Sequence, residues 1–292
     1  MAAESVSLLA RAKVNLCLHV TGRREDGYHL LDSLVVFPDI GDLVTARADP
    51  AISLTLGGPN AAATGAPAGN LVLRAAEAMA AAFPGRGARL HLHKVLPVAA
   101  GLGGGSADAG ATIRALERLW GVALEPGRRR ALALSLGADV PSCLCSLPAR
   151  MRGIGEDLAP APAMPECALV LVNPGVAVPT AAVFAAFGEP GPPLGAIPER
   201  FCSPQSLAAW LALQRNDLEP AARRVAPAVG VVLAALSGLG QVLLSRMSGS
   251  GATCFGLCAS EAAAEDAARV LRGLHPDWWV AVAPLRRWPG AG

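Results

Sequence analysis

The chain has 292 residues, enough for one large domain or two modest domains that each bury a real hydrophobic core. Its formal net charge of +2 gives no strong steering toward nucleic acid, so we expect no nucleic-acid partner. Hydrophobic residues make up 52% of the sequence but aromatic residues only 4%, and this composition does not by itself indicate a membrane protein.

Two uncharged stretches, residues 169–188 and 225–245, approach the length that spans a bilayer. Both are interrupted by proline and glycine, which predicts strand, turn and helix in the first and helix, turn and strand in the second. We therefore expect no membrane partner. The N-terminus lacks the pattern of a secretory signal, and seven cysteines without metal-type spacing fit reduced thiols, so we expect a cytoplasmic protein.

The first predicted elements are strands at residues 14–20, 30–37, 42–48 and 52–56. In the first of them, Leu16, Leu18 and Val20 alternate with polar residues, the period of two typical of a half-buried strand. A polar, glycine-flanked excursion separates it from the second strand.

Helices and strands then alternate. Asn70 is a good N-cap for a helix over residues 71–82, and a strand follows at residues 89–95. A helix begins at Ser106 and stops at Gly121, and another runs over residues 126–136. A strand, a glycine-rich loop and a helix are therefore consecutive.

The stretch 159–165, rich in proline and alanine, predicts a linker and a boundary between two domains, residues 1–160 and residues 161–292. Downstream we expect a strand at 168–172, a helix at 180–187 and strands at 241–246 and 253–258.

The strongest functional signal is the segment 97–106, PVAAGLGGGS. Four glycines just before a helix let backbone amides approach an anion closely, so a phosphate would lie at the helix N-terminus. Ser106 could cap this helix and offer its hydroxyl to a phosphate or its metal ion, whereas a carboxylate at Asp108 would slightly oppose the anion. A flexible turn without a ligand is the alternative.

Other glycine motifs do not fit this segment. The P-loop requires a lysine after its last glycine, and none is present. The dinucleotide fingerprint requires a glycine where Ser106 stands.

Three ordered segments resemble the GHMP kinases, a family named for galactokinase, homoserine kinase, mevalonate kinase and phosphomevalonate kinase. They are the glycine-rich segment, AKVNL at residues 12–16 and MSGSGA at residues 247–252. Further matches, GYH at 27–29, GADVP at 137–141, GIGE at 153–156 and NDLE at 216–219, extend the resemblance over most of the chain. Gly110 departs from the usual alanine and would slightly weaken its helix.

The resemblance implies an α+β fold with an N-terminal domain of the ribosomal-protein S5 type that binds ATP and catalyses, and a ferredoxin-like C-terminal domain on the substrate side. It also implies ATP as co-substrate, accompanied by Mg²⁺. The phosphates of ATP would be bound by backbone N–H groups and a hydroxyl group. The matching residues are Pro97, Gly101, Leu102, Gly103, Gly104, Gly105 and Ser106. We identify no protein ligand of the metal ion.

Lys13 and Asp139 are the candidate catalytic residues. Phosphoryl transfer to an alcohol needs a group that accepts or orients the hydroxyl proton and a cation that stabilises the transferring oxygens. The resemblance implies that Asp139 is the base and that Lys13 pairs with it. The alternatives are a helix N-cap for Asp139 and a solvent-reaching ammonium for Lys13.

The GYH and GADVP segments resemble the members that phosphorylate the 2-hydroxyl of a cytidine diphosphate-linked methylerythritol, an isoprenoid precursor. The implied substrate-binding residues are Asn15, Tyr28, His29, Thr180, Phe184, Gly249, Ser250 and Gly251. Tyr28 would stack on the cytosine ring, and His29 would form a hydrogen bond with the edge of that ring. Phe184 could stack on the opposite face or belong to the core, and residues 249–251 could form a simple tight turn.

Three other functions remain open. A GHMP kinase acting on mevalonate or homoserine would not require Tyr28 and His29. A decarboxylase of the same superfamily would release carbon dioxide after phosphorylation. A non-catalytic nucleotide-binding regulator would not need Lys13 and Asp139. The expected partners are small molecules, and the chain would be a monomer or a homodimer.

Overall fold

The structure is a computed structural model that describes residues 4–290. The chain divides into two compact units. Unit 1 contains residues 4–12, 41–98 and 103–146, and unit 2 contains residues 13–40, 99–102 and 147–290. The chain passes repeatedly from one unit to the other, so sequence position alone does not assign a segment. The expected boundary at residue 160 lies within unit 2. The assignment of ATP binding to residues 1–160 and of the substrate side to residues 161–292 stays a prediction.

A four-stranded sheet forms the centre of unit 1. Its strands, in spatial order, are β1 (Ser5–Arg11), β4 (Gly41–Ala48), β6 (Ala88–His93) and β5 (Ser53–Gly57). β5 runs parallel to β6, and the other pairs are antiparallel. Along β6, Leu90 and Leu92 are buried while Arg89 and His91 are exposed, as their alternation predicts. Two short 3-10 helices, η1 (Ala61–Thr64) and η2 (Pro67–Gly69), follow β5.

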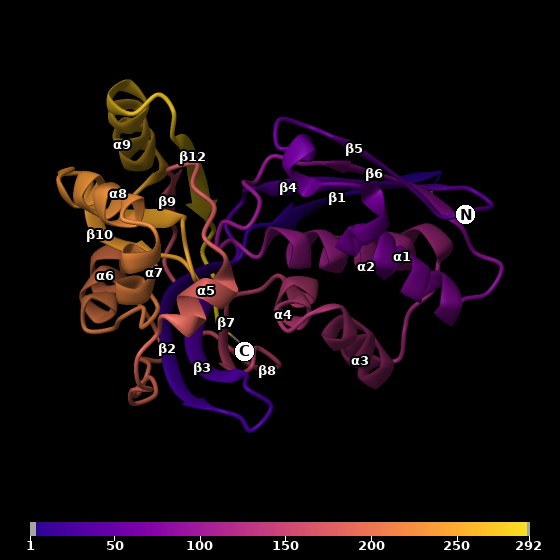
Figure 1. Ribbon diagram of the computed structural model, residues 1–292, viewed down its shortest axis with the longest axis horizontal. Coiled ribbons are helices and arrows are strands. Elements are labelled where there is room, and N and C mark those ends of the chain that lie inside the picture. The colour runs from indigo at the N-terminus through magenta and orange to yellow at the C-terminus, as the bar shows by residue number, and fades with distance from the viewer. Residues whose placement is uncertain (1–3, 291–292) are drawn as a thin grey trace. The chain divides into compact units, whose positions relative to one another are not determined.

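α1 (Leu71–Ala82) and α2 (Gly104–Trp120) lie against one face of this sheet (Figure 1). α3 (Pro126–Leu136) and α4 (Val140–Cys145) pack against these two helices on the side away from the sheet. The predicted cap of α1 is confirmed, because the side chain of Asn70 accepts a hydrogen bond from the N–H of Val72 at 2.9 Å. α2 is buried along most of its length, which holds its N-terminus in a fixed place beside the ends of the strands.

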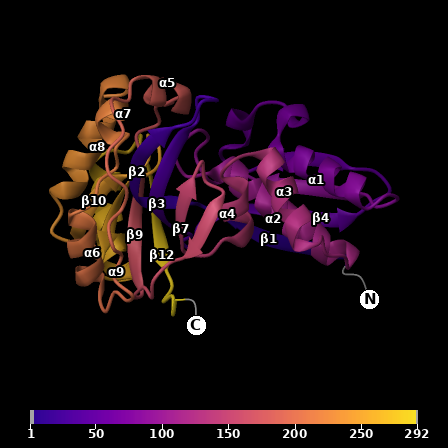
Figure 2. The same cartoon turned by 90° about the horizontal axis from the view of Figure 1, so that it is seen from below.

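The first sheet of unit 2 contains β2 (Val14–Arg23), β3 (His29–Val36), β7 (Ala149–Gly153) and β8 (Asp157–Pro160), in that order. Figure 2 shows the first three of these strands. The half-buried β2 expected from the sequence is wrong, because Val14–Val20 is buried on both faces. Its polar residues find partners inside the protein: Asn15 donates to the hydroxyl of Ser33, and His19 contacts the carbonyl oxygen of Pro192.

The second sheet of unit 2 is antiparallel, with β10 (Val242–Met247), β11 (Cys254–Cys258), β9 (Cys167–Asn173) and β12 (Trp279–Leu285) in that order. Its helices are α5 (Thr180–Ala185), α6 (Pro204–Ala212), α7 (Glu219–Val225), α8 (Ala228–Ser237) and α9 (Glu261–Leu274). α9 buries Ala264, Ala268 and Leu271, which recur at helical spacing, in one core with α8 and the sheet.

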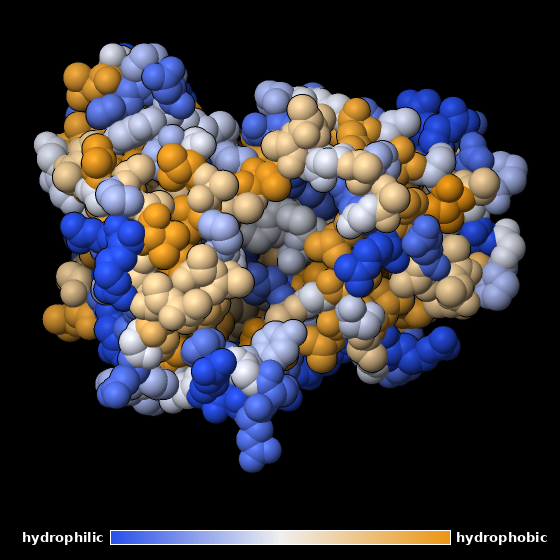
Figure 3. Space-filling model, viewed as in Figure 1, coloured by the Kyte–Doolittle hydropathy of each residue, from blue (hydrophilic) through white to orange (hydrophobic). Residues whose placement is uncertain are grey.

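Both stretches that were tested as membrane spans have the predicted interruptions. Residues 169–188 contain β9, a turn and α5, and residues 225–245 contain α8, a turn and the start of β10. Within residues 4–290, none of the helices combines the length and the apolar composition that crossing a bilayer requires. Polar and apolar residues are interspersed over the face drawn in Figure 3. The expected α+β class is confirmed, whereas β1, β7, β8 and β12 were not predicted.

Candidate active site

The N-terminus of α2 begins within the glycine-rich segment. Gly103 is its N-cap, in the left-handed region at φ 60°, and the first bond of the helix runs from the N–H of Ala107 to the carbonyl of Gly103 at 2.8 Å. The N–H groups of Gly104, Gly105 and Ser106 precede that bond and can serve an anion. The expectation that Ser106 caps the helix is wrong, because left-handed backbone at Gly103 starts the helix earlier.

A buried group of three charges lies under the first turns of α2. The ammonium of Lys94 donates to a carboxylate oxygen of Asp42 and to one of Asp108, each at 2.6 Å. The other oxygen of Asp42 accepts from the N–H groups of Val95 and Leu96, at 2.6 and 2.8 Å. Sequence reasoning noted only Asp108. The signal it missed was Lys94 itself, a lysine three residues before Pro97 in an alternating strand.

Burial sets the ionisation of this group. Desolvation raises the pKa of Asp108 to about 7 and the nearby Asp42 adds to the shift, although Lys94 opposes both. For Lys94, burial would lower the pKa, but the two carboxylates more than offset it and the pKa is raised. Lys94 therefore stays charged, while Asp108 can change its protonation near neutrality.

In unit 2, the glycine-rich segment contacts the loop that follows β10. The hydroxyl of Ser248 donates to the carbonyl of Gly101 at 2.9 Å, and the N–H of Thr253 donates to the carbonyl of Ala100 at 3.1 Å. A Cβ added at Gly101, where φ is 72°, would lie 2.4 Å from the carbonyl oxygen of Ser248. Only glycine fits this approach, so the loop at residues 249–251, referred to below as the GSG loop, packs closely against the glycine-rich segment.

The start of β2 meets the same loop. The N–H of Lys13 donates to the carbonyl of Leu102 at 2.8 Å, and the N–H of Asn15 donates to the hydroxyl of Ser248 at 3.1 Å. A Cβ at Gly249 would lie 3.5 Å from the side-chain oxygen of Asn15. Lys13 is buried, so the interpretation as an ammonium reaching solvent is wrong. Lys13, Asn15 and Gly249 thus gather around residues 101–102.

Tyr28 lies in the turn between β2 and β3, His29 is the first residue of β3, and Phe184 lies in α5. The rings of His29 and Phe184 are stacked with centroids 4.7 Å apart, and Phe187 contacts His29 edge-on at 5.9 Å. Phe184 is partly buried against the core of unit 2, and its stacking on a cytosine stays a prediction. Tyr28 is 56% exposed and available to a ligand. The hydroxyls of Thr180 and Ser250 are 2.9 Å apart, which joins α5 to the GSG loop.

Asp139 belongs to unit 1, where it occupies the N-cap position of α4 with φ −83° and ψ −14°. Its side chain makes no capping hydrogen bond, unlike those of Asn70 and Glu125 at the starts of α1 and α3. The carboxylate is therefore not used to begin the helix, and capping does not account for this aspartate.

Two residues that support unit 2 carried no role in the sequence analysis. The side-chain amide of Asn216 donates to the carbonyls of Met247 and Gly249, both at 2.8 Å. These two bonds hold the backbone on either side of Ser248, where the chain enters the GSG loop. Buried Arg246 donates to the carbonyls of Leu16 and Leu211, at 2.9 and 2.7 Å. The NDLE pattern was the available signal for Asn216, whereas nothing in the local sequence singles out Arg246.

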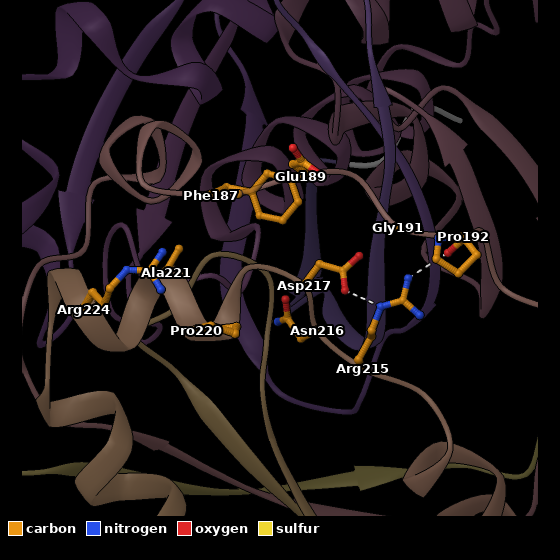
Figure 4. Close-up of a pocket in the computed structure, with 11 residues that line it drawn as sticks. Phe187, Glu189, Gly191, Pro192, Arg215, Asn216, Asp217, Pro220, Ala221 and Arg224 are labelled. Carbon is orange, nitrogen blue, oxygen red and sulfur yellow. Dashed lines mark hydrogen bonds and ion pairs between the residues drawn. The ribbon is translucent and has the colours of Figure 1, made fainter.

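A cavity of about 430 Å³ in unit 2 adjoins Asn216 (Figure 4). Arg215, Asp217 and Arg224 face it, but each guanidinium has a partner. Arg215 pairs with Asp217 and donates to the carbonyl of Pro192 at 2.8 Å, and Arg224 donates to the carbonyl of Ala186 at 2.6 Å. Asp217 thus balances the charge of Arg215, whereas Arg224 is held by a neutral carbonyl.

Two parts of the chain match a known protein family. Residues 70–146 match the family described as GHMP kinases N terminal domain, and residues 203–277 match GHMP kinases C terminal. A protein of Cereibacter sphaeroides, 4-diphosphocytidyl-2-C-methyl-D-erythritol kinase, is 55% identical over 94% of this chain and 98% of its own length. A protein of the same name from Paramagnetospirillum magneticum is 52% identical over 96% and 99%.

Solved structures give the same picture. A crystal structure of 4-(cytidine 5'-diphospho)-2C-methyl-D-erythritol kinase aligns with a TM-score of 0.78 at 35% identity, over 96% of this chain and all of that one. Homoserine kinase from Cytophaga hutchinsonii aligns with a TM-score of 0.70 at 19% identity, over 99% of this chain and 97% of that one, a likeness of fold. The two-domain GHMP kinase fold that the family resemblance implied is confirmed.

Proposed function

Since this chain belongs to the GHMP kinase family, we propose that it transfers the terminal phosphoryl group of ATP to the 2-hydroxyl of 4-diphosphocytidyl-2-C-methyl-D-erythritol. The product would be the 2-phosphate, an intermediate of isoprenoid precursor synthesis. The observation that carries this proposal is the identity of 50–55% with relatives of that name over nearly their full lengths. Such identity extends well beyond the phosphate-binding motif.

ATP would place its phosphates at the N-terminus of α2. Three backbone N–H groups and the positive end of the helix are available there, at Gly104, Gly105 and Ser106. The phosphates would reach this helix end along the preceding part of the glycine-rich segment, which contains Pro97, Gly101, Leu102 and Gly103. Mg²⁺ would arrive with ATP and take most of its ligands from phosphate oxygens and water, with the hydroxyl of Ser106 within the same helical turn. Bound Mg²⁺ would neutralise charge that develops on the transferring oxygens.

The chemical step would be a direct, in-line transfer. The acceptor oxygen forms a bond to the γ-phosphorus, the bond to the bridging oxygen breaks, and ADP leaves. Asp139 would take the hydroxyl proton, and Lys13 would orient the acceptor and balance the negative charge. No phosphoenzyme forms. The low exposure of Lys13 supports this role, because a desolvated ammonium acts strongly on nearby charge.

The substrate would be held by residues of unit 2. Tyr28, Phe184 and His29 would hold the cytosine by stacking and by a hydrogen bond, and Asn15 would bind the diphosphate or the polyol. Thr180 and the loop Gly249, Ser250, Gly251 would line the same site. The stacked pair of His29 and Phe184 supports this assignment, because a flat ring already finds an aromatic face there.

The proposed roles of the two halves follow the sequence: residues 1–160 for ATP and catalysis, residues 161–292 for the substrate side. Asn15, Tyr28 and His29 belong to the first range, although their contacts group them with unit 2. We further propose a cytoplasmic enzyme that is a monomer or a homodimer, a proposal with which seven free cysteines agree.

The test is ADP release by the purified protein with Mg-ATP. The acceptors, offered separately, are 4-diphosphocytidyl-2-C-methyl-D-erythritol, methylerythritol phosphate, mevalonate and homoserine. Turnover confined to the cytidyl compound is expected. Turnover with mevalonate or homoserine would retain the kinase and overturn the cytidine pocket, and no turnover with any acceptor would favour a nucleotide-binding regulator. Release of carbon dioxide would indicate the decarboxylase.

A further inference from the structure

The three buried charges beneath α2 are organised around one atom, the ammonium nitrogen of Lys94. Asp42 comes from β4, Lys94 follows β6, and Asp108 lies in α2, so the group joins three elements of unit 1. Relative exposures of 0%, 3% and 2% exclude water from it. Buried charges are costly unless they are paired, so an arrangement of this kind calls for an explanation beyond packing.

The ammonium lies directly against the phosphate-binding helix. A Cβ added at Gly104, the first residue of α2, would be 3.2 Å from the nitrogen of Lys94 and 3.8 Å from a carboxylate oxygen of Asp42. Asp42 in turn holds the N–H groups of Val95 and Leu96, which lead into Pro97. A shift of Lys94 would therefore move both the entry to the glycine-rich segment and the start of α2.

The charge balance matters for an anion at this helix. With both carboxylates ionised, the group has a net charge of −1 and opposes phosphate binding at the N-terminus. With Asp108 protonated, it is neutral. One oxygen of Asp108 has no hydrogen-bond partner among the described residues, so it has room to carry that proton.

We propose that Lys94 is a positioning residue for ATP, which fixes the start of α2 and cancels the carboxylate charge beneath the bound phosphates, and that nucleotide binding favours the protonated form of Asp108. This inference rests on the proposed function, because it needs ATP at α2. Among the residues 4–290, the charged groups that act on Asp108 are Lys94 and Asp42. A bound anion adds a third field, of the sign that favours protonation.

The sign of the pH effect follows. Because the pKa of Asp108 in the free protein is about 7, the carboxyl is protonated at lower pH and the anion binds best there. As pH rises through that value, Asp108 is deprotonated in the free protein and must take up a proton when the nucleotide binds. The affinity for the nucleotide therefore falls. A shift of one unit in the pKa on binding corresponds to a tenfold loss between the two plateaus.

The experiment measures binding of a non-hydrolysable ATP analogue by calorimetry, without acceptor, between about pH 6 and pH 8.5. The variants are Asp108→Asn, Lys94→Met and the double variant, with Asp266→Asn, an exposed carboxylate, as the matched control. Between the low and the high end of this pH range, the affinity of the wild type and of the control for the analogue should fall by a factor roughly tenfold larger than that of Asp108→Asn. Comparison at equal pH cancels the titration of the analogue itself.

Lys94→Met should weaken binding at neutral pH, and the double variant should recover part of the loss because the charge that Lys94 cancelled is also removed. Equal pH slopes for the wild type and Asp108→Asn, or strictly additive losses in the double variant, would overturn the inference. If Lys94→Met does not fold, the Asp108→Asn slope decides alone. A wild type that binds no nucleotide would instead overturn the proposed function.

Discussion

The hydroxyl of Ser248 bonds the carbonyl oxygen of Gly101 at 2.9 Å and also accepts the N–H of Asn15 at 3.1 Å. Residues almost 150 positions apart thus meet at one buried oxygen. The three segments that carry the family resemblance are those that this hydroxyl joins, since each contributes one of the partners. Segments that lie far apart in the sequence therefore support one another: the glycine-rich segment, β2 and the GSG loop.

Gly101→Ala should abolish activity and cost stability. The substitution places a methyl group 2.4 Å from a backbone oxygen and forces alanine to φ 72°. The left-handed backbone alone costs about 1–2 kcal/mol, so the loss in the free energy of unfolding should exceed that value. Urea denaturation and ADP release measure the two effects.

Gly121→Ala is the matched control for that variant. Gly121 has φ 64°, yet an added Cβ there has no neighbour within 4 Å. It should cost only the left-handed backbone strain, about 1–2 kcal/mol, and leave activity intact. Equal effects of the two substitutions would mean that backbone strain, and not the close approach to Ser248, matters at Gly101.

Asp139→Asn should remove turnover while leaving affinity for ATP nearly unchanged. Asparagine cannot accept the hydroxyl proton, and the side chain is not needed as a helix cap, so α4 should remain intact. Rapid-quench measurement of phosphoryl transfer reports the chemical step, and calorimetry with the ATP analogue reports binding. A variant with more than about a tenth of wild-type turnover would remove Asp139 from the role of base.

Tyr28→Ala should raise KM for the cytidyl substrate with little effect on stability, because the ring is 56% exposed. Stacking of a base on an aromatic ring contributes about 1–3 kcal/mol, so a rise of roughly tenfold is expected. KM for ATP should not change. The comparison is with Trp278→Ala, which removes a ring stacked on His275 at 3.7 Å outside the proposed site. An unchanged KM in Tyr28→Ala would argue against a cytidine pocket.

Local sequence patterns predicted the elements whose partners are close in the chain. The Asn70 cap, the strand predicted over 89–95 and the helix over 126–136 depend on neighbours within a few residues, and all three are confirmed. Gly110 was different, because its sequence context suggested only a weaker helix. A Cβ there would lie 2.8 Å from the N–H nitrogen of Leu144, so glycine lets α4 approach α2.

Long-range partners explain what the sequence did not disclose about the site. Lys94 pairs with a carboxylate 52 positions away, and Arg246 bonds a carbonyl 230 positions away. No local periodicity reports such contacts. The roles of Lys13, Asn15 and Asp139 came from the family resemblance and stay predictions, whereas the placement of Asn15 beside Gly249 and Ser248 is now described.

Arg246→Met should destabilise unit 2 strongly. The buried guanidinium of Arg246 donates to the carbonyls of Leu16, Leu211 and Gln214, at 2.9, 2.7 and 2.9 Å, so it connects β10 to β2 and to the end of α6. Methionine of similar length fills the space but supplies no donor. Each buried carbonyl left without a partner costs about 1–3 kcal/mol, so the free energy of unfolding should fall by at least about 3 kcal/mol.

Arg269→Met gives the contrast for this prediction. Arg269 pairs with Asp266 on an exposed surface, where such pairs contribute about 0–1 kcal/mol. Urea denaturation of both variants separates the two cases. Because β2 also carries Asn15, any folded Arg246→Met protein should show a higher KM for the acceptor than the wild type, while Arg269→Met should not. Equal stability of the two variants would mean that water replaces Arg246 at the three carbonyls, and β2 would then need another support.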